Sequence, residues 1–268
     1  MDVQSIAYRT DLALLELGGS VVEDRGDRLV VRTPHNPTFH WGNFLLLDRP
    51  PAAADVPVLL ADVDATFPDS THRAIGVDGP TSDPDALAPL VAAGLSLDVA
   101  AVMTARATQA PPRPNADATY RPLASDEDWQ QRVALAARCN EDHPADEYLA
   151  FMSSKARTDR ALTQAGHGAW WGAFVDGRLV SSLGLFRAGE GSARFQSVET
   201  DPAFRGRGLA GTLVHETSRW GLAELDVETL VMVADPDYVA IRIYRSVGFA
   251  ETERQTQLHQ PDRRVSRP

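Results

Sequence analysis

The sequence predicts a mixed α/β (α+β) fold in two domains, and three observations lead to that prediction. Strand-like and helix-like runs alternate along the chain. A proline-rich stretch interrupts them between Ala107 and Thr119 and is typical of a linker. The length of 268 residues suits one large domain or two modest ones. We therefore expect a first domain over residues 1–110, a linker over 111–118 and a second domain over 119–268.

The composition is that of an ordinary globular protein and argues against several classes of partner. A formal net charge of -11 disfavours nucleic acid, which requires a basic face. Cys139 is the only cysteine, so the chain can form no internal disulfide and no cysteine-rich metal site. No apolar run approaches the roughly 20 residues that span a bilayer, and the N-terminus does not resemble a secretion signal. We expect a cytoplasmic protein with no membrane or nucleic-acid partner.

The second domain is expected to begin with two helices. Ser125 and Asp128 have the spacing of a capping box at the start of the first helix, and the second covers about 145–165. Asp176-Gly177 is a strong hairpin signal between two strands. In chain order we expect strands at 170–175, 178–186, 193–200 and 229–233, a helix from Leu209 to about Leu222, and a last helix after Asp237 that ends at Gly248.

A loop rich in arginine and glycine joins the strand that ends near Thr200 to the helix that begins near Leu209. Unpaired N–H groups and the positive end of the helix dipole converge there on a possible anion. Gly206 and Gly208 let the backbone approach a phosphate closely, and Arg205 and Arg207 add positive charge. Taken alone, the loop is equally compatible with a tight connection that carries a solvated arginine pair.

Two spaced motifs give the second domain a family resemblance. Arg205, Gly208 and Ala210 form the first, with Pro202 upstream. Ala240, Tyr244 and Gly248-Phe249 form the second, in which Asp237 replaces the usual Asn. Together and in this order they resemble the GNAT superfamily of acetyl-coenzyme A dependent acyltransferases over roughly residues 120–259. The resemblance implies a mixed, mostly antiparallel sheet flanked by helices.

The resemblance also implies where acetyl-coenzyme A binds. The strand ending near Thr200 would splay from the strand around Val231, and the pantetheine arm would fill the gap. Asp237 can cap the last helix, but an ionised Asp cannot donate a hydrogen bond to the pantetheine arm. The expected cofactor contacts are the backbone of Val198 and Thr200, the loop residues Arg205, Gly206, Arg207, Gly208, Leu209 and Ala210, and the helix-start positions Asp237 and Ala240.

Two residues are candidates for the chemistry. Tyr244, at the family's tyrosine position, would donate a proton to the departing thiolate; otherwise it is a core tyrosine of the last helix. Glu199 would accept the proton of the amine. Strand alternation places it on the opposite face from Val198 and Thr200 unless a bulge re-aims it. A solvated strand carboxylate and proton removal by bulk solvent remain open.

The first domain resembles a second, degenerate copy of the same fold, so the whole chain is expected to hold two such domains in tandem. Strands at 29–32, 44–47 and 100–104 and a helix at 85–93 carry this resemblance, with Gly94 closing the helix. The segment lacks an Arg/Gln-plus-glycine loop, so nothing in it supports coenzyme A binding. Packing against the second domain and shaping the acceptor site are its expected roles.

The predicted function is direct acetyl transfer from acetyl-coenzyme A to a primary amine, either a small molecule or a protein amine. No metal is assigned, because Glu141, Asp142 and His143 are more typical of a solvated helix end than of a ligand set. A coenzyme A binding sensor or scaffold without turnover is the main rival. A nucleotide-binding domain ranks last because the chain lacks a Gly-Lys-Ser/Thr phosphate loop. The oligomeric state is left unassigned.

Overall fold

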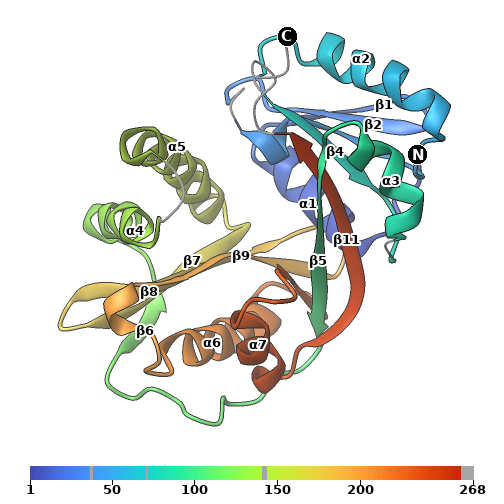
Figure 1. The fold of residues 1–268 in the computed structure, drawn as a ribbon. Helices are drawn as coiled ribbons and strands as arrows, with labels where there is room; N and C mark the ends of the chain where they lie inside the picture. Colours follow the sequence, from blue (N-terminus) through green and yellow to red (C-terminus); the bar gives the residue numbers. More distant parts are fainter. Residues whose placement is uncertain (37–38, 71, 82, 141–143, 261–268) are drawn as a thin grey trace. The chain divides into compact units, whose positions relative to one another are not determined.

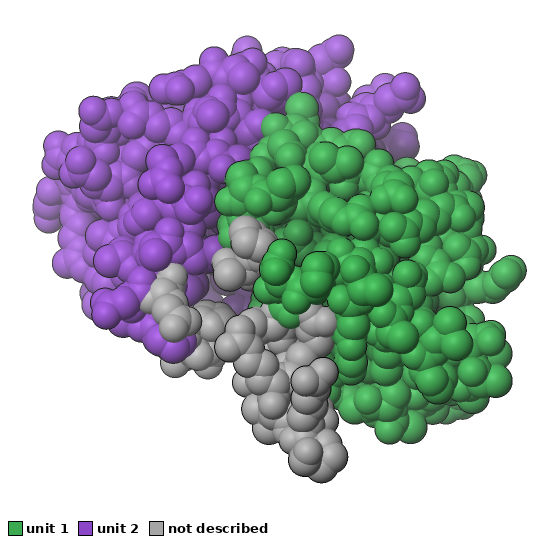
Figure 2. All heavy atoms as spheres, turned by 90° about the horizontal axis from the view of Figure 1, so that it is seen from above, with its two compact units in different colours: residues 1–102, 233–236, 251–268 green, residues 103–232, 237–250 purple. Residues whose placement is uncertain are grey.

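The computed structural model describes residues 1–36, 39–70, 72–81, 83–140 and 144–260. The chain forms two compact units (Figure 2). Unit 1 contains Met1–Val102, Val233–Pro236 and the segment that starts at Glu251, and unit 2 contains Met103–Met232 and Asp237–Ala250. The sequence predicts continuous domains over 1–110 and 119–268, whereas each compact unit is built from separate stretches of the chain.

Unit 1 is a mixed sheet with helices on both faces (Figure 1). Its strand order is β1-β2-β3-β4-β11-β5. The elements are α1 (Ile6–Leu17), β1 (Val21–Asp24), β2 (Arg28–Arg32), β3 (Phe44–Leu47), α2 (Val56–Thr66), β4 (Arg73–Val77), α3 (Pro84–Ala92), β5 (Ser96–Ala105) and β11 (Ala250–Gln260). The strands predicted at 29–32, 44–47 and 100–104 and the helix at 85–93 lie within β2, β3, β5 and close to α3.

Strand alternation divides the apolar side chains of unit 1 between two cores. Leu29 and Val31 of β2 belong to the core that contains Tyr8 of α1. Val30 points to the other face and joins Leu59 of α2. Because successive strand residues face opposite sides, one apolar strand supplies both layers.

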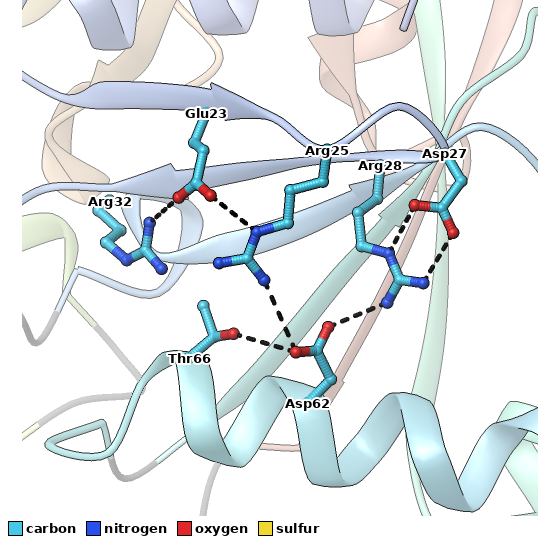
Figure 3. Close-up of polar contacts among 7 residues, drawn as sticks. All are labelled: Glu23, Arg25, Asp27, Arg28, Arg32, Asp62 and Thr66. Carbon is cyan, nitrogen blue, oxygen red and sulfur yellow. Dashed lines mark hydrogen bonds and ion pairs between the residues drawn. The ribbon is translucent and has the colours of Figure 1, made fainter.

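Ion pairs fasten α2 to the β1–β2 hairpin (Figure 3). The Asp62 carboxylate accepts from Arg28 Nη1 at 3.0 Å and pairs with Arg25 Nη1 at 3.6 Å. Glu23 accepts from both Arg25 and Arg32 on the same hairpin. These side chains are partly exposed, so the network fixes geometry more than it adds stability.

Strand β11 comes from the end of the described chain but belongs to the sheet of unit 1. It pairs antiparallel with β4, and Leu258 opposite Ile75 is fully buried. Its Glu253 carboxylate accepts from Ile6 N and Ser5 Oγ at the start of α1. Residues far apart in sequence therefore complete one sheet.

Unit 2 is a mostly antiparallel sheet with the order β10-β9-β8-β7-β6, with α4 and α5 on one face and α6 and α7 on the other (Figure 1). Its elements are β6 (Thr119–Pro122), α4 (Asp126–Cys139), α5 (Ala145–Gln164), β7 (Gly168–Val175), β8 (Arg178–Arg187), β9 (Ser192–Thr200), α6 (Leu209–Glu224), β10 (Thr229–Ala234) and α7 (Ala240–Val247). The predicted fold class, a mixed sheet flanked by helices, is confirmed.

Local sequence signals set several boundaries in unit 2. Ser125 caps α4, and its side chain and that of Asp128 form the complete capping box. Asp176 and Gly177 both have positive φ, 49° and 77°, as the tight turn between β7 and β8 requires. Gly248 ends α7 in the left-handed conformation. Among the described helices, none has the length and apolar character needed to cross a membrane.

Candidate active site

The parallel strands β9 and β10 pair over only part of their length. Their register covers Ser192–Arg194 of β9 against Thr229–Val231 of β10. Beyond it, Phe195–Thr200 continue β9 outside the β10 register. Phe195, the first of these residues, makes an edge contact with Phe249 at a ring-centroid distance of 5.8 Å. Strand β9 therefore pairs with its parallel neighbour only as far as Arg194, and the gap that the resemblance implies would lie beyond this residue.

A bulge in β9 decides how Glu199 is oriented. Ser182 of β8 faces Glu199, whereas Gly184 faces Gln196, so β9 carries an extra residue between these pairs. Ser197 lies there with a φ of 40°, which is rare for a residue with a side chain. The bulge breaks the alternation between Gln196 and Glu199, so it changes the face on which Glu199 lies relative to the first part of β9.

The arginine-glycine loop ends in a helix start without a side-chain cap. Gly206 and Gly208 have φ of 77° and 78°, and Gly208 occupies the N-cap of α6. A Cβ on Gly208 would lie 2.4 Å from the Arg113 carbonyl oxygen, so only glycine fits there. Arg205 and Arg207 are exposed. First-turn amides and two exposed arginine side chains thus lie in one short loop, which suits an anion.

The sequence analysis overlooks Asn115, which fastens the predicted linker to this loop. Its side-chain amide donates to the Arg207 carbonyl oxygen at 3.0 Å, and its backbone N–H donates to Thr212 Oγ1 at 2.9 Å. Its Oδ1 accepts from Ala118 N and Tyr120 Oη. The signal in the sequence is an Asn between Pro114 and Asp117, a pattern that favours a side-chain turn. This part of the linker is therefore a fixed support of the loop.

Glu199 lies largely inside unit 2. Burial raises the pKa of its carboxyl to about 7, although the positive charges of Arg132 and Lys155 act to lower it. Its Oε2 atom is buried and has no protein partner among the described residues. A carboxylate with a pKa near neutrality can take up and release a proton under physiological conditions.

Arg132 of α4 is a second buried group of the site that the sequence analysis overlooks. Its side chain is 0% exposed, and its Nη2 donates to Asp159 Oδ2 of α5 at 2.6 Å. The guanidinium lies 3.5 Å from the ring centroid of Trp170 in β7. No local sequence pattern marks it, because Asp159 and Trp170 come from two other elements, α5 and β7.

Tyr244 is buried in α7, with 5% of its surface exposed. Burial, and to a lesser degree Tyr238, raises the pKa of its phenol well above the ordinary value. The phenol therefore keeps its proton at physiological pH and can donate it. Within the part of the chain that the structure describes, no hydrogen bond joins Tyr244 to Glu199.

The start of α7 differs from the expectation. Val239, and not Asp237, occupies the N-cap, and the Val239 side chain makes no cap hydrogen bond. Asp237 is exposed two residues earlier, and Ala240 is the first helical residue. Glu141, Asp142 and His143 lie outside the described residues.

Comparison with known proteins finds the same fold in other structures. Several solved structures share the fold over nearly the whole chain. A functionally unknown conserved protein from Staphylococcus epidermidis has a TM-score of 0.72 and 11% identity, with 91% of this chain and 94% of the other covered. A GCN5-related N-acetyltransferase from Kribbella flavida has a TM-score of 0.70 and 18% identity, with 98% of each chain covered.

A tandem GNAT protein from the clavulanic acid biosynthesis pathway is similar as well, with a TM-score of 0.58, 16% identity, and 92% of this chain and 87% of the other covered. The chain has no match among curated proteins. Residues 128–249, which make up most of unit 2, match the model of the Acetyltransferase (GNAT) family, a class of acyltransferases.

Proposed function

We propose that this protein transfers an acetyl group from acetyl-coenzyme A directly to a primary amine, and that unit 2 carries the reaction. The observation that carries the proposal is the departure of β9 from β10 next to the uncapped start of α6, with Glu199 buried on the departing strand. The strand edge would pair with the pantetheine arm, and the helix start would bind the pyrophosphate. The carboxylate would accept the proton of the amine.

The residues present fit acetyl-coenzyme A. Backbone groups of Val198 and Thr200 lie on the part of β9 beyond the β10 register, where a pantetheine arm can pair as an added strand would. The amides from Arg205 to Ala210 would hold the pyrophosphate. The small side chain of Ala240 would leave room for the cofactor at the start of α7. The ionised carboxylate of Asp237, which is exposed, would donate no hydrogen bond to the pantetheine arm. The bound thioester supplies an activated acetyl carbon.

Two side chains then carry out the two proton transfers of the reaction. Glu199 accepts a proton from the amine as its nitrogen bonds to the acetyl carbon. The carbon–sulfur bond breaks, and Tyr244 donates a proton to the departing sulfur. Both groups suit their roles at neutral pH, because the carboxyl has a pKa of about 7 and the phenol retains its proton.

Unit 1 is proposed to be a degenerate GNAT-like domain that does not bind coenzyme A. Its parallel pair β3 and β4 remains in register to Leu47 opposite Val77, and the Asp78 N–H still donates to the Leu47 carbonyl oxygen. No gap opens there for a pantetheine arm. The likeness to a tandem GNAT protein supports the same two-domain proposal.

Release of coenzyme A thiol, measured across a panel of small-molecule amines and peptides with free amines, tests the function. We expect turnover with at least one amine and a fall of about 10²-fold in kcat for Tyr244→Phe. Binding of acetyl-coenzyme A without turnover by any amine would contradict the transferase and leave a coenzyme A sensor. Tyr238→Phe is the matched control, since Tyr238 is an exposed tyrosine just before the same helix.

A further inference from the structure

The segment 109–115 belongs to unit 2 and packs closely against the start of α6. Pro111 is buried, and a Cβ added to Gly211 would lie 3.2 Å from the Pro111 Cβ. A Cβ added to Gly208, the N-cap of α6, would collide with the Arg113 carbonyl oxygen. The segment therefore lies directly on the first turn of this helix, although the sequence predicts a linker here.

Asn115 is the residue of this segment whose side chain contacts the arginine-glycine loop. Its Oδ1 accepts from the N–H groups of Asp117 and Ala118 at 3.1 Å each and from Tyr120 Oη at 3.2 Å. An amide oxygen only accepts and an amide nitrogen only donates, so these three donors fix the orientation of the side chain. Its Nδ2 faces the Arg207 carbonyl oxygen and donates to it at 3.0 Å.

Two successive peptide groups of the loop are fixed by hydrogen bonds. In a planar trans peptide the C=O and the N–H point in opposite directions. The bond from Asn115 to the Arg207 carbonyl therefore turns the Gly208 N–H away from the segment. The Gly208 carbonyl accepts from Thr212 N at 3.1 Å and from Thr212 Oγ1 at 3.0 Å, which turns the Leu209 N–H toward the open end of α6.

The Thr212 hydroxyl connects the segment to the second of these peptide groups. Its Oγ1 accepts from the Asn115 N–H at 2.9 Å while it donates to the Gly208 carbonyl. A loop with two glycines has many conformations when nothing holds it. A loop that is already ordered in its binding conformation loses less entropy when the ligand binds.

We infer that Asn115 is a positioning residue for the diphosphate of acetyl-coenzyme A, because it holds the Gly208 N–H in the direction from which the diphosphate accepts it. The inference rests on the proposed function for the identity of the donor. It extends the donor site beyond the residues that match the family model, since Asn115 precedes residues 128–249.

Isothermal titration of the full chain with acetyl-coenzyme A tests the inference. Asn115→Ala should weaken binding by about 3- to 10-fold, the effect of one lost hydrogen bond. Asn115→Asp keeps an oxygen that accepts from Asp117 and Ala118 but cannot donate to Arg207. It should retain the turn and lose at least as much affinity, so it keeps the test valid if the alanine variant does not fold. Wild-type affinity in the folded variants would overturn the role of Asn115.

Three further variants separate this role from an added charge and from a loosened segment. Thr212→Val removes the hydroxyl without adding charge and should weaken binding, whereas Thr212→Ser keeps the hydroxyl and should bind like the wild type. Gln109→Ala is the matched control, because its Nε2 donates at 3.2 Å to the Ser246 carbonyl oxygen at the end of α7 and not to the loop. A loss in Gln109→Ala as large as in Asn115→Ala would contradict the inference.

Kinetics with two donors distinguish positioning from general damage. With acetyl-coenzyme A, Asn115→Ala should raise KM for the donor and leave kcat unchanged, since the diphosphate is remote from the acetyl group. With S-acetylpantetheine, which has no diphosphate, kcat/KM should equal that of the wild type. Equal losses with both donors would overturn the inference. Binding of acetyl-coenzyme A without acetylation of any amine would instead contradict the proposed function, and the titration would still decide the role of Asn115.

Discussion

At the scale of single residues, the site depends on how far burial and charge move two ordinary side chains from their usual behaviour. Glu199 is an unremarkable strand carboxylate in the sequence, and only its removal from water raises its pKa to about 7. Burial acts on Tyr244 in the same direction but keeps the phenol neutral. One physical cause, burial, therefore suits Glu199 and Tyr244 to the proposed roles of base and acid.

The pH dependence of turnover follows from this. Since the base works when ionised, kcat/KM of the wild type should rise with pH and reach half its plateau near pH 7. Glu199→Gln should lower the plateau by about 10²-fold and abolish this limb. Initial rates between pH 5 and pH 9 at a subsaturating amine concentration give this dependence of kcat/KM on pH. A limb that persists in Glu199→Gln would assign the proton transfer to the amine or to solvent.

At the scale of elements, the connection from β9 to α6 is where backbone conformation matters most. Two glycines with positive φ bring the chain round to an uncapped helix start, and Asn115 holds the turn from outside. The arginines beside them are exposed and adaptable. Backbone shape, rather than side-chain charge, is therefore expected to control binding of the donor.

This can be tested with a set of loop variants. Gly208→Val should weaken acetyl-coenzyme A binding by about tenfold or more, because the side chain meets the Arg113 carbonyl and the φ of 78° is strained. Gly206→Ala shares the strain, but its Cβ meets nothing within 4 Å, so it should cost less. Arg207→Lys should have the smallest effect. Isothermal titration ranks them, and a larger loss for Arg207→Lys would contradict the backbone argument.

At the scale of the whole molecule, the last described strand stabilises the unit formed by the beginning of the chain. Strand β11 pairs with β4, and its backbone and side chains fix α1 through Tyr8 and Glu253. The hydrogen bond from Tyr8 to Thr256 joins residues 248 positions apart and so closes a very long loop. Unit 1 therefore depends on chain that follows unit 2 in sequence.

Leu258→Ala measures this dependence. The side chain is 0% exposed in the core with Ile75 and Leu90, so its loss should destabilise unit 1 by about 3 kcal/mol. Hydrogen exchange should accelerate at the amides of β3 and β4 and remain unchanged in β7 and β8. Gln257→Ala, on the half-buried position before it, is the control. Faster exchange in unit 2 alone would show that β11 supports the other unit.

The sequence by itself determined the local elements and the order of the motifs. The capping box of α4, the Asp176-Gly177 turn and the Gly248 end of α7 depend on neighbouring residues, so each could be predicted from a short window. The helices α1 and α2 and the strands β1 and β4 were not expected from the sequence, although Ser5 and Gly18 bound α1. The spaced motifs predict the family whose model matches residues 128–249.

Only the tertiary structure decided that Glu199 is largely buried and which sheet receives β11. The bulge at Ser197, the Arg132–Asp159 pair and the β4–β11 register join segments that are distant in sequence. The tertiary structure also distinguishes the two pairs of parallel strands. Strand β9 extends beyond its register with β10, whereas β3 remains paired with β4 to its last residue. These features depend on long-range packing and burial, which change the charge state and direction of a residue without leaving a local pattern.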